Sequence, residues 1–96
     1  MERSEINVGA LVVYTLRRTW ENDPEREDFV IRRDDSDVGR VYLTKVPEGL
    51  RFVWSIYMDG RVSLAPGVAN RGAAITLDEA IAAFKQSYEA MRAGET

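Results

Sequence analysis

The feature that most constrains the fold is an apolar stripe in the last quarter of the sequence, residues 74–96. Large apolar residues recur there at alternating spacings of four and three, which is the pattern of one face of a helix: Leu77, Ile81, Phe84, Tyr88 and Met91. We therefore predict a C-terminal helix over residues 74–93. A lone helix of this length is marginal in water, so the preceding residues must supply an apolar surface for the stripe.

Both ends of this helix are marked in the sequence. Thr76 followed by Glu79 forms the pattern of a capping box, in which each residue can satisfy a backbone N–H of the other. Asp78 adds negative charge to the first turn and Arg92 positive charge to the last, and both charges favour the helix dipole. Gly94 is suited to the position that follows a helix.

Alternating apolar and polar residues precede the helix and predict strands. We predict strands at residues 6–16, 28–33, 38–46 and 50–58, with turns at 34–37 and 47–49, a further short edge strand at 62–64 and a loop over 65–73. The first segment, Ile6–Leu16, favours a strand because it is dense in β-branched residues. Its pattern leaves open whether it joins the main sheet, covers the sheet or forms a short helix.

The order of these elements predicts an α+β fold in a single domain over residues 1–96. We expect residues 1–5 to be flexible, residues 6–66 to supply an antiparallel meander of three to five strands, and the helix to pack on one face of it. The strand order itself is left open. The residues predicted to form the covered face share one parity along the strands: Phe29, Ile31, Val41, Leu43, Phe52, Trp54 and Ile56.

Composition excludes several kinds of chemistry. The chain has no cysteine and no histidine, so it lacks thiolate ligands, disulfides and the commonest general base near neutral pH. Asp34, Asp35 and Asp37 lack the spacing of a calcium loop and are better explained by a hairpin turn. We expect no enzymatic activity, no cofactor and no metal. The first residues do not resemble a secretory signal and no apolar run could span a bilayer, so we expect a cytoplasmic protein with no membrane association.

The second face of the predicted sheet is the candidate binding surface. Although the net charge is −3, residues 38–75 carry five basic residues against two acidic ones. The predicted binding face consists of the polar parity of the strands: Arg32, Arg40, Tyr42, Thr44, Arg51, Ser55 and Tyr57. Such a face can be simply solvated, or it can bind a protein partner or a second copy. A rival hypothesis is weak nucleic-acid binding, and a third is a small-molecule pocket under residues 65–73.

Three segments of the sequence resemble a group of small bacterial proteins of unassigned function: Asp37–Tyr42 (DVGRVY), Trp54–Ile56 (WSI) and Gly72–Ala80 (GAAITLDEA). The resemblance covers about residues 28–92 and implies a fold but no activity. The order of strands and helix is also similar to the N-terminal arm-binding domains of tyrosine recombinases, which place a basic sheet face on DNA. This chain is acidic overall, so only the topology carries over.

Overall fold

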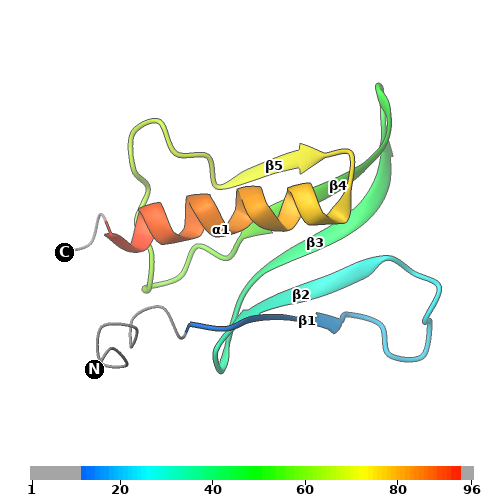
Figure 1. The fold of residues 1–96 in the computed structure, drawn as a ribbon, viewed down its shortest axis with the longest axis horizontal. Helices are drawn as coiled ribbons and strands as arrows, with labels where there is room; N and C mark the ends of the chain where they lie inside the picture. The colour runs from blue at the N-terminus through cyan, green and yellow to red at the C-terminus, as the bar shows by residue number, and fades with distance from the viewer. Residues whose placement is uncertain (1–11, 94–96) are drawn as a thin grey trace, which may run out of the picture.

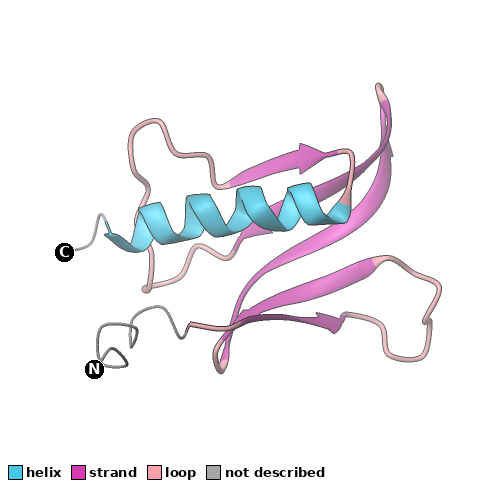
Figure 2. Cartoon of the chain, viewed as in Figure 1, coloured by secondary structure: helices cyan, strands magenta, loops and turns pink. Residues whose placement is uncertain are grey.

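A computed structural model describes residues 12–93 and shows one antiparallel sheet with a helix on one face (Figures 1 and 2). The strands lie in the sheet in the same order as in the sequence. This confirms the predicted α+β meander with a C-terminal helix. The elements are β1 (Tyr14–Arg18), β2 (Asp28–Arg33), β3 (Ser36–Val46), β4 (Gly49–Ile56), β5 (Arg71–Ala74) and α1 (Leu77–Ala93).

The β2–β3 hairpin is tighter than the sequence predicted. Only Asp34 and Asp35 connect the strands, and Asp34 adopts a positive φ of 54°, which aspartate tolerates better than most residues. The predicted turn at 34–37 is therefore too long. A bulge follows, because Ile31 pairs with Gly39 whereas Arg32 pairs with Asp37. The extra residue, Val38, is buried in the core.

Three other strand predictions need correction. β1 contains residues 14–16 of the predicted strand 6–16 and continues to Arg18, and residues 12 and 13 are not part of it. Residues 1–11 lie outside the described part of the chain. β4 ends at Ile56 rather than Met58. Residues 62–64 form no strand, because Val62 turns into the core from the loop between β4 and β5.

β5 was predicted as the end of a loop and is instead an edge strand paired with β4. Its sequence, Arg71-Gly-Ala-Ala, has little intrinsic strand preference, so the pairing with β4 decides its conformation. A Cβ on Gly72 would lie 2.7 Å from the Trp54 ring, so this glycine allows the indole to pack against the strand.

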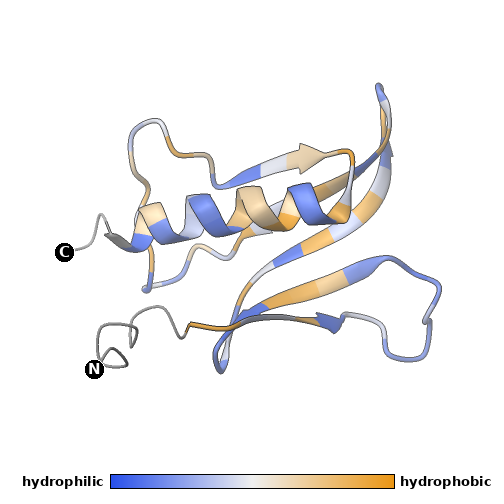
Figure 3. Cartoon of the chain, in the orientation of Figure 1, coloured by the Kyte–Doolittle hydropathy of each residue, from blue (hydrophilic) through white to orange (hydrophobic). Residues whose placement is uncertain are grey.

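The helix α1 begins at Leu77 rather than at the predicted residue 74, and it covers the apolar face with its predicted stripe. Phe84, Tyr88 and Met91 are buried, and Leu77 and Ile81 are half-buried at the periphery. In Figure 3 apolar and polar segments alternate along β3, as expected of a sheet with one covered face. The Phe84 ring meets Trp54 edge-on at 6.0 Å between centroids and stacks on Tyr88 at 5.9 Å.

Six of the seven sheet residues predicted for the core join it, the exception being Leu43. Leu43 lies toward the β3–β4 turn, which extends past the N-terminal end of α1 (Figure 1). Gly39 allows the Phe84 ring of the helix to approach the sheet closely. A Cβ there would overlap both the Phe84 ring and the carbonyl oxygen of Ser55.

Polar contacts fix both ends of α1. The Glu79 N–H donates to the Thr76 hydroxyl at 3.1 Å, which is one half of the predicted capping box. Near the other end, Glu89 accepts hydrogen bonds from Arg33 Nε at 2.7 Å and from the Tyr14 hydroxyl. We call this contact the Glu89 latch, because it ties the helix to β1 and β2.

Candidate functional site

The predicted binding residues lie together on the face of the sheet opposite α1. The register pairs Arg40 with Ser55 and Thr44 with Arg51, and alternation along β2 places Arg32 on the same face. Tyr42 and Tyr57 complete the set. We name this surface the open face. By the same register it also includes Thr15, Arg17, Asp28, Val30, Asp37, Val53, Arg71 and Ala73.

Among residues 12–93, no helix or strand packs on the open face (Figure 2). The Trp20 ring reaches only its edge, where the indole Nε1 donates to Asp28 at 3.0 Å. The arrangement on which the functional hypotheses depend, a sheet covered on one side, is therefore present in the described part of the chain.

Asp28 organises one end of the open face. Its side chain is almost completely buried and also accepts hydrogen bonds from the Thr19 hydroxyl at 2.8 Å and from Arg40 Nε at 2.9 Å. The Arg40 hydrogen bond, aided by Thr19 and Trp20, outweighs the effect of burial and lowers the pKa of Asp28 from 3.8 to about 2. Asp28 is therefore ionised at neutral pH and holds Arg40 in a fixed position.

The other carboxylate of the open face, Asp37, holds two arginines. Arg32 Nε donates to it at 2.8 Å and Arg17 Nη2 at 3.0 Å. The Arg32 hydrogen bond is the main cause that lowers the pKa of Asp37. Arg40, already bound to Asp28, lies over the Tyr42 ring with its guanidinium carbon 4.7 Å from the centroid.

Two further arginines of the open face bind no carboxylate among residues 12–93. Arg51 donates only to the Leu50 carbonyl oxygen, at 2.8 Å, and Arg71 is exposed on β5. The open face thus carries five arginines against two aspartates, a net charge of +3 within a chain of net charge −3. Positive charge is concentrated on the side of the sheet that α1 leaves uncovered.

Sequence reasoning missed several residues of this face for different reasons. Arg17 lies one residue beyond the predicted end of the first strand. Had that strand been predicted to continue with the same alternation, Arg17 would have been placed on the open face. Arg71 could not be found by alternation because β5 was not predicted. Asp28 was predicted to begin a strand, but nothing in the sequence shows that its carboxylate binds Arg40 across the sheet.

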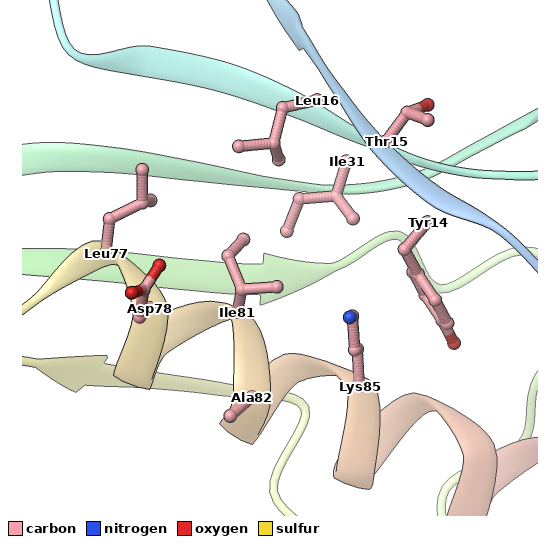
Figure 4. A pocket seen from close by; sticks show the side chains of 9 residues that line it. All are labelled: Tyr14, Thr15, Leu16, Ile31, Leu77, Asp78, Ile81, Ala82 and Lys85. Carbon is pink, nitrogen blue, oxygen red and sulfur yellow. The ribbon is translucent and has the colours of Figure 1, made fainter.

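On the helix side, an apolar groove of about 430 Å3 lies between β1 and α1 (Figure 4). Leu16 and Ile31 point from the strands toward Leu77 and Ile81 on the helix. Lys85 closes one end, with its amino group 5.2 Å from the centroid of the Tyr14 ring. Leu16 is 40% exposed here, on a strand that forms one edge of the sheet.

A second cleft, of about 410 Å3, lies beside Arg61 at the other end of α1. Neither this cleft nor the groove is lined by residues 65–73, where the sequence suggested a small-molecule pocket. Within the described residues, no group of three or more acidic side chains is placed to hold a metal ion. No helix in that part of the chain has the length and apolar character needed to cross a membrane.

Comparisons of the chain with protein-family models, with curated proteins and with solved structures found no match. The resemblance to small bacterial proteins therefore stays a prediction, and any function has to be argued from the surfaces described above.

Proposed function

We propose that this chain is a cytoplasmic, non-enzymatic protein-interaction module whose open face binds an acidic surface of a partner protein. The observation that carries the proposal is the net charge of +3 on the open face of an acidic protein. Complementary charge directs association toward partners of opposite sign and disfavours partners of like sign. The proposal explains why arginine, rather than the more flexible lysine, provides all the positive charge of this face.

The centre of the open face suits a protein partner. Tyr42 and Val53 lie opposite each other, and Ala73 continues the row on β5. Val30 is buried between Arg17 and Arg40, which flank it on the neighbouring strands. Small apolar groups surrounded by arginine and tyrosine side chains are typical of interfaces between proteins.

Self-association is part of the proposal, but through a different surface. If two copies met through their open faces, two surfaces that each carry a net charge of +3 would lie against each other. The repulsion between them disfavours that arrangement. Pairing through the edge of β1 would not bring two positively charged faces together. Asp34 N–H donates to the Val13 carbonyl and Thr19 N–H to the Asp28 carbonyl, so residues of odd number in β1 bond toward β2. The backbone groups of Tyr14, Leu16 and Arg18 therefore point outward.

A second copy can pair with this edge in an antiparallel register centred on Leu16. Tyr14 of each copy then lies opposite Arg18 of the other, and the two Leu16 side chains meet beside the apolar groove. No like charges lie directly opposite each other, and each outward backbone group gains a partner. We infer that self-association, where it occurs, uses β1.

The alternative function is weak nucleic-acid binding on the open face. It is favoured by the register, which places Arg17, Arg40 and Arg71 in one row across the sheet, about 10 Å apart for alternate strands. It is disfavoured by the ion pairs of the same row. Arg17 and Arg40 already bind Asp37 and Asp28, so a phosphate would have to compete with a carboxylate at two of the three positions.

One set of binding measurements distinguishes the two functions. The anisotropy of a labelled poly-glutamate peptide and of a labelled oligothymidylate would be measured against protein concentration at low and at moderate salt. The test variant is Arg51→Glu with Arg71→Glu, which leaves the internal ion pairs intact. Lys45→Glu with Lys85→Glu is the matched control, because it changes the charge equally at two exposed residues outside the open face.

We expect the peptide to bind, the double variant to lose about tenfold or more in affinity, and the control to stay within about twofold. Tighter binding of the oligothymidylate, with a steep dependence on salt, would establish the alternative instead. If neither probe binds at low salt, the open face is not a binding surface for acidic partners. For the β1 edge, sedimentation at increasing concentration should show a dimer that Leu16→Glu abolishes and that Leu64→Glu, in an exposed loop, preserves.

A further inference from the structure

The second cleft combines positive charge with hydroxyl groups and lies apart from the open face. It lies between the β2–β3 hairpin, the loop after β4 and the last turns of α1. Its charged lining residues are all arginines, namely Arg33, Arg61 and Arg92, and they are joined by Ser36 and Tyr88. We call it the arginine cleft.

Carboxylates hold these arginines from outside the cleft. Glu89 accepts from Arg33 Nε at 2.7 Å and from Arg92 Nη1 at 3.2 Å, and Asp59 accepts from Arg61 Nε at 3.2 Å. Neither carboxylate lines the cleft. The ion pairs therefore orient the guanidinium groups without filling the space between them, as supporting groups do behind a binding site.

Each guanidinium keeps donors that are not used within residues 12–93. Arg33 and Arg61 use Nε and Nη2, which leaves Nη1 of both without a partner there. Arg92 uses only Nη1. The three arginines that line the cleft thus keep N–H groups that are unused within residues 12–93.

Tyr88 supplies a second, independent observation. It is only 2% exposed, its ring stacks on Phe84, and its hydroxyl has no hydrogen-bond partner among the described residues. Most polar atoms of buried side chains have a hydrogen-bond partner, and because Tyr88 lines the cleft, a ligand or water there can supply one. Tyr88 lines the cleft together with Arg33, Arg61 and Arg92. Burial raises the pKa of Tyr88, the charge of Arg61 lowers it, the charge of Asp59 raises it, and the charges of Arg33 and Arg92 lower it.

We propose that the arginine cleft binds a small molecule through its phosphate group. A phosphate accepts hydrogen bonds on several oxygens at once, so it can contact three guanidinium groups and a hydroxyl together. A carboxylate has only two oxygens and pairs best with one guanidinium group. The volume of about 410 Å3 exceeds that of the phosphate alone and leaves room for an organic part of the molecule.

Two effects oppose the proposal. The first is the ion pairs: each of the three arginines already binds Glu89 or Asp59, so a phosphate has to use the N–H groups that these carboxylates leave unused. The second is the helix dipole. The cleft lies beside the C-terminal end of α1, where the helix dipole disfavours an anion. A hydrogen bond between charged groups is stronger than this dipole effect, and the three arginines keep several N–H groups for such bonds. The balance favours binding of the anion.

The test measures binding of glycerol 2-phosphate, inorganic phosphate and succinate at matched ionic strength. Arginine side-chain Nε–H signals in NMR spectra report the site, and the shift of the melting temperature reports the affinity. The site variants are Arg61→Gln and Tyr88→Phe. Arg26→Gln is the matched control, because Arg26 also forms an exposed ion pair with a neighbouring aspartate, Asp23, but lies in the β1–β2 loop.

We expect saturable binding of glycerol 2-phosphate that shifts the signals of Arg33, Arg61 and Arg92. Arg61→Gln should weaken it by about tenfold and Arg26→Gln by less than about twofold. Tyr88→Phe should weaken binding while leaving the melting temperature of the free protein unchanged, since the hydroxyl it removes has no hydrogen-bond partner among residues 12–93. Equal binding of succinate, equal losses in Arg61→Gln and Arg26→Gln, or no saturable binding would each overturn the proposal.

Discussion

Replacement of Gly39 by alanine tests the packing of α1 on the sheet directly. The added Cβ would overlap the Phe84 ring, with the ring Cζ 2.6 Å away, and would also overlap the Ser55 carbonyl oxygen. The ring could shift, but the carbonyl belongs to β4, whose pairing with β3 fixes it. Alanine is otherwise favoured over glycine in a strand by about 0.5–1 kcal/mol, which offsets a small part of the strain.

Overpacking of a core costs about 1–3 kcal/mol, and an immovable backbone atom places this site at the upper end. We expect Gly39→Ala to lower the free energy of unfolding by about 2–3 kcal/mol, out of the ~5–14 kcal/mol typical of a domain of this size. With a urea dependence near 1 kcal/mol per molar, the midpoint measured by circular dichroism should fall by about 2 M or more.

The matched control is Gly60→Ala, because a Cβ on Gly60 would meet nothing within 4 Å. Its midpoint should change by less than about 0.5 M, as for an ordinary surface substitution. In a Phe84→Leu background the ring overlap disappears and the carbonyl overlap remains, so the cost of Gly39→Ala should fall by about 1 kcal/mol without vanishing. A wild-type midpoint for Gly39→Ala, or the same cost in both backgrounds, would refute the packing described here.

Three further predictions concern stability. Asp28→Asn should lower the free energy of unfolding by about 2 kcal/mol at neutral pH, because the pKa of this carboxyl falls from 3.8 to about 2 on folding. A lowered pKa stabilises the folded state above pH 3.8, and this stabilisation is lost as the pH falls toward 2. Acid titrations of stability should show this loss in the wild type but not in the variant. Thr76→Ala should cost about 1 kcal/mol by urea unfolding, since it removes the helix cap. Met91→Ala should cost about 2–5 kcal/mol in the same assay, because Met91 is fully buried.

The parts of the fold that local pattern decides could be predicted from the sequence. β2 has the predicted bounds, and the helix stripe packs as its spacing indicated. The alternation of apolar residues along β4 also predicted correctly which of its residues lie on the open face. In these segments each residue's position follows from its near neighbours in the chain, so periodicity is sufficient.

The parts that depend on contacts between distant residues could not be predicted. β5 forms because β4 offers it a partner, and Val62 is buried because a long loop returns to the core. The arginine cleft joins Arg33, Arg61 and Arg92 from three separate elements, and no spacing in the sequence relates them. The ion pairs of Arg17, Arg32 and Arg40 on the open face also join residues that no sequence spacing relates.

The Glu89 latch has a consequence for how this chain reaches its folded state. The hydrogen bond from Tyr14 to Glu89 joins residues 75 positions apart, and β1 and α1 are the first and last described elements. A chain emerging from the ribosome therefore displays the apolar side of its meander before the element that shields it has been synthesised. Chaperone dependence and the yield of soluble material should consequently respond to changes in α1 more than to changes of equal energetic cost in the β2–β3 hairpin.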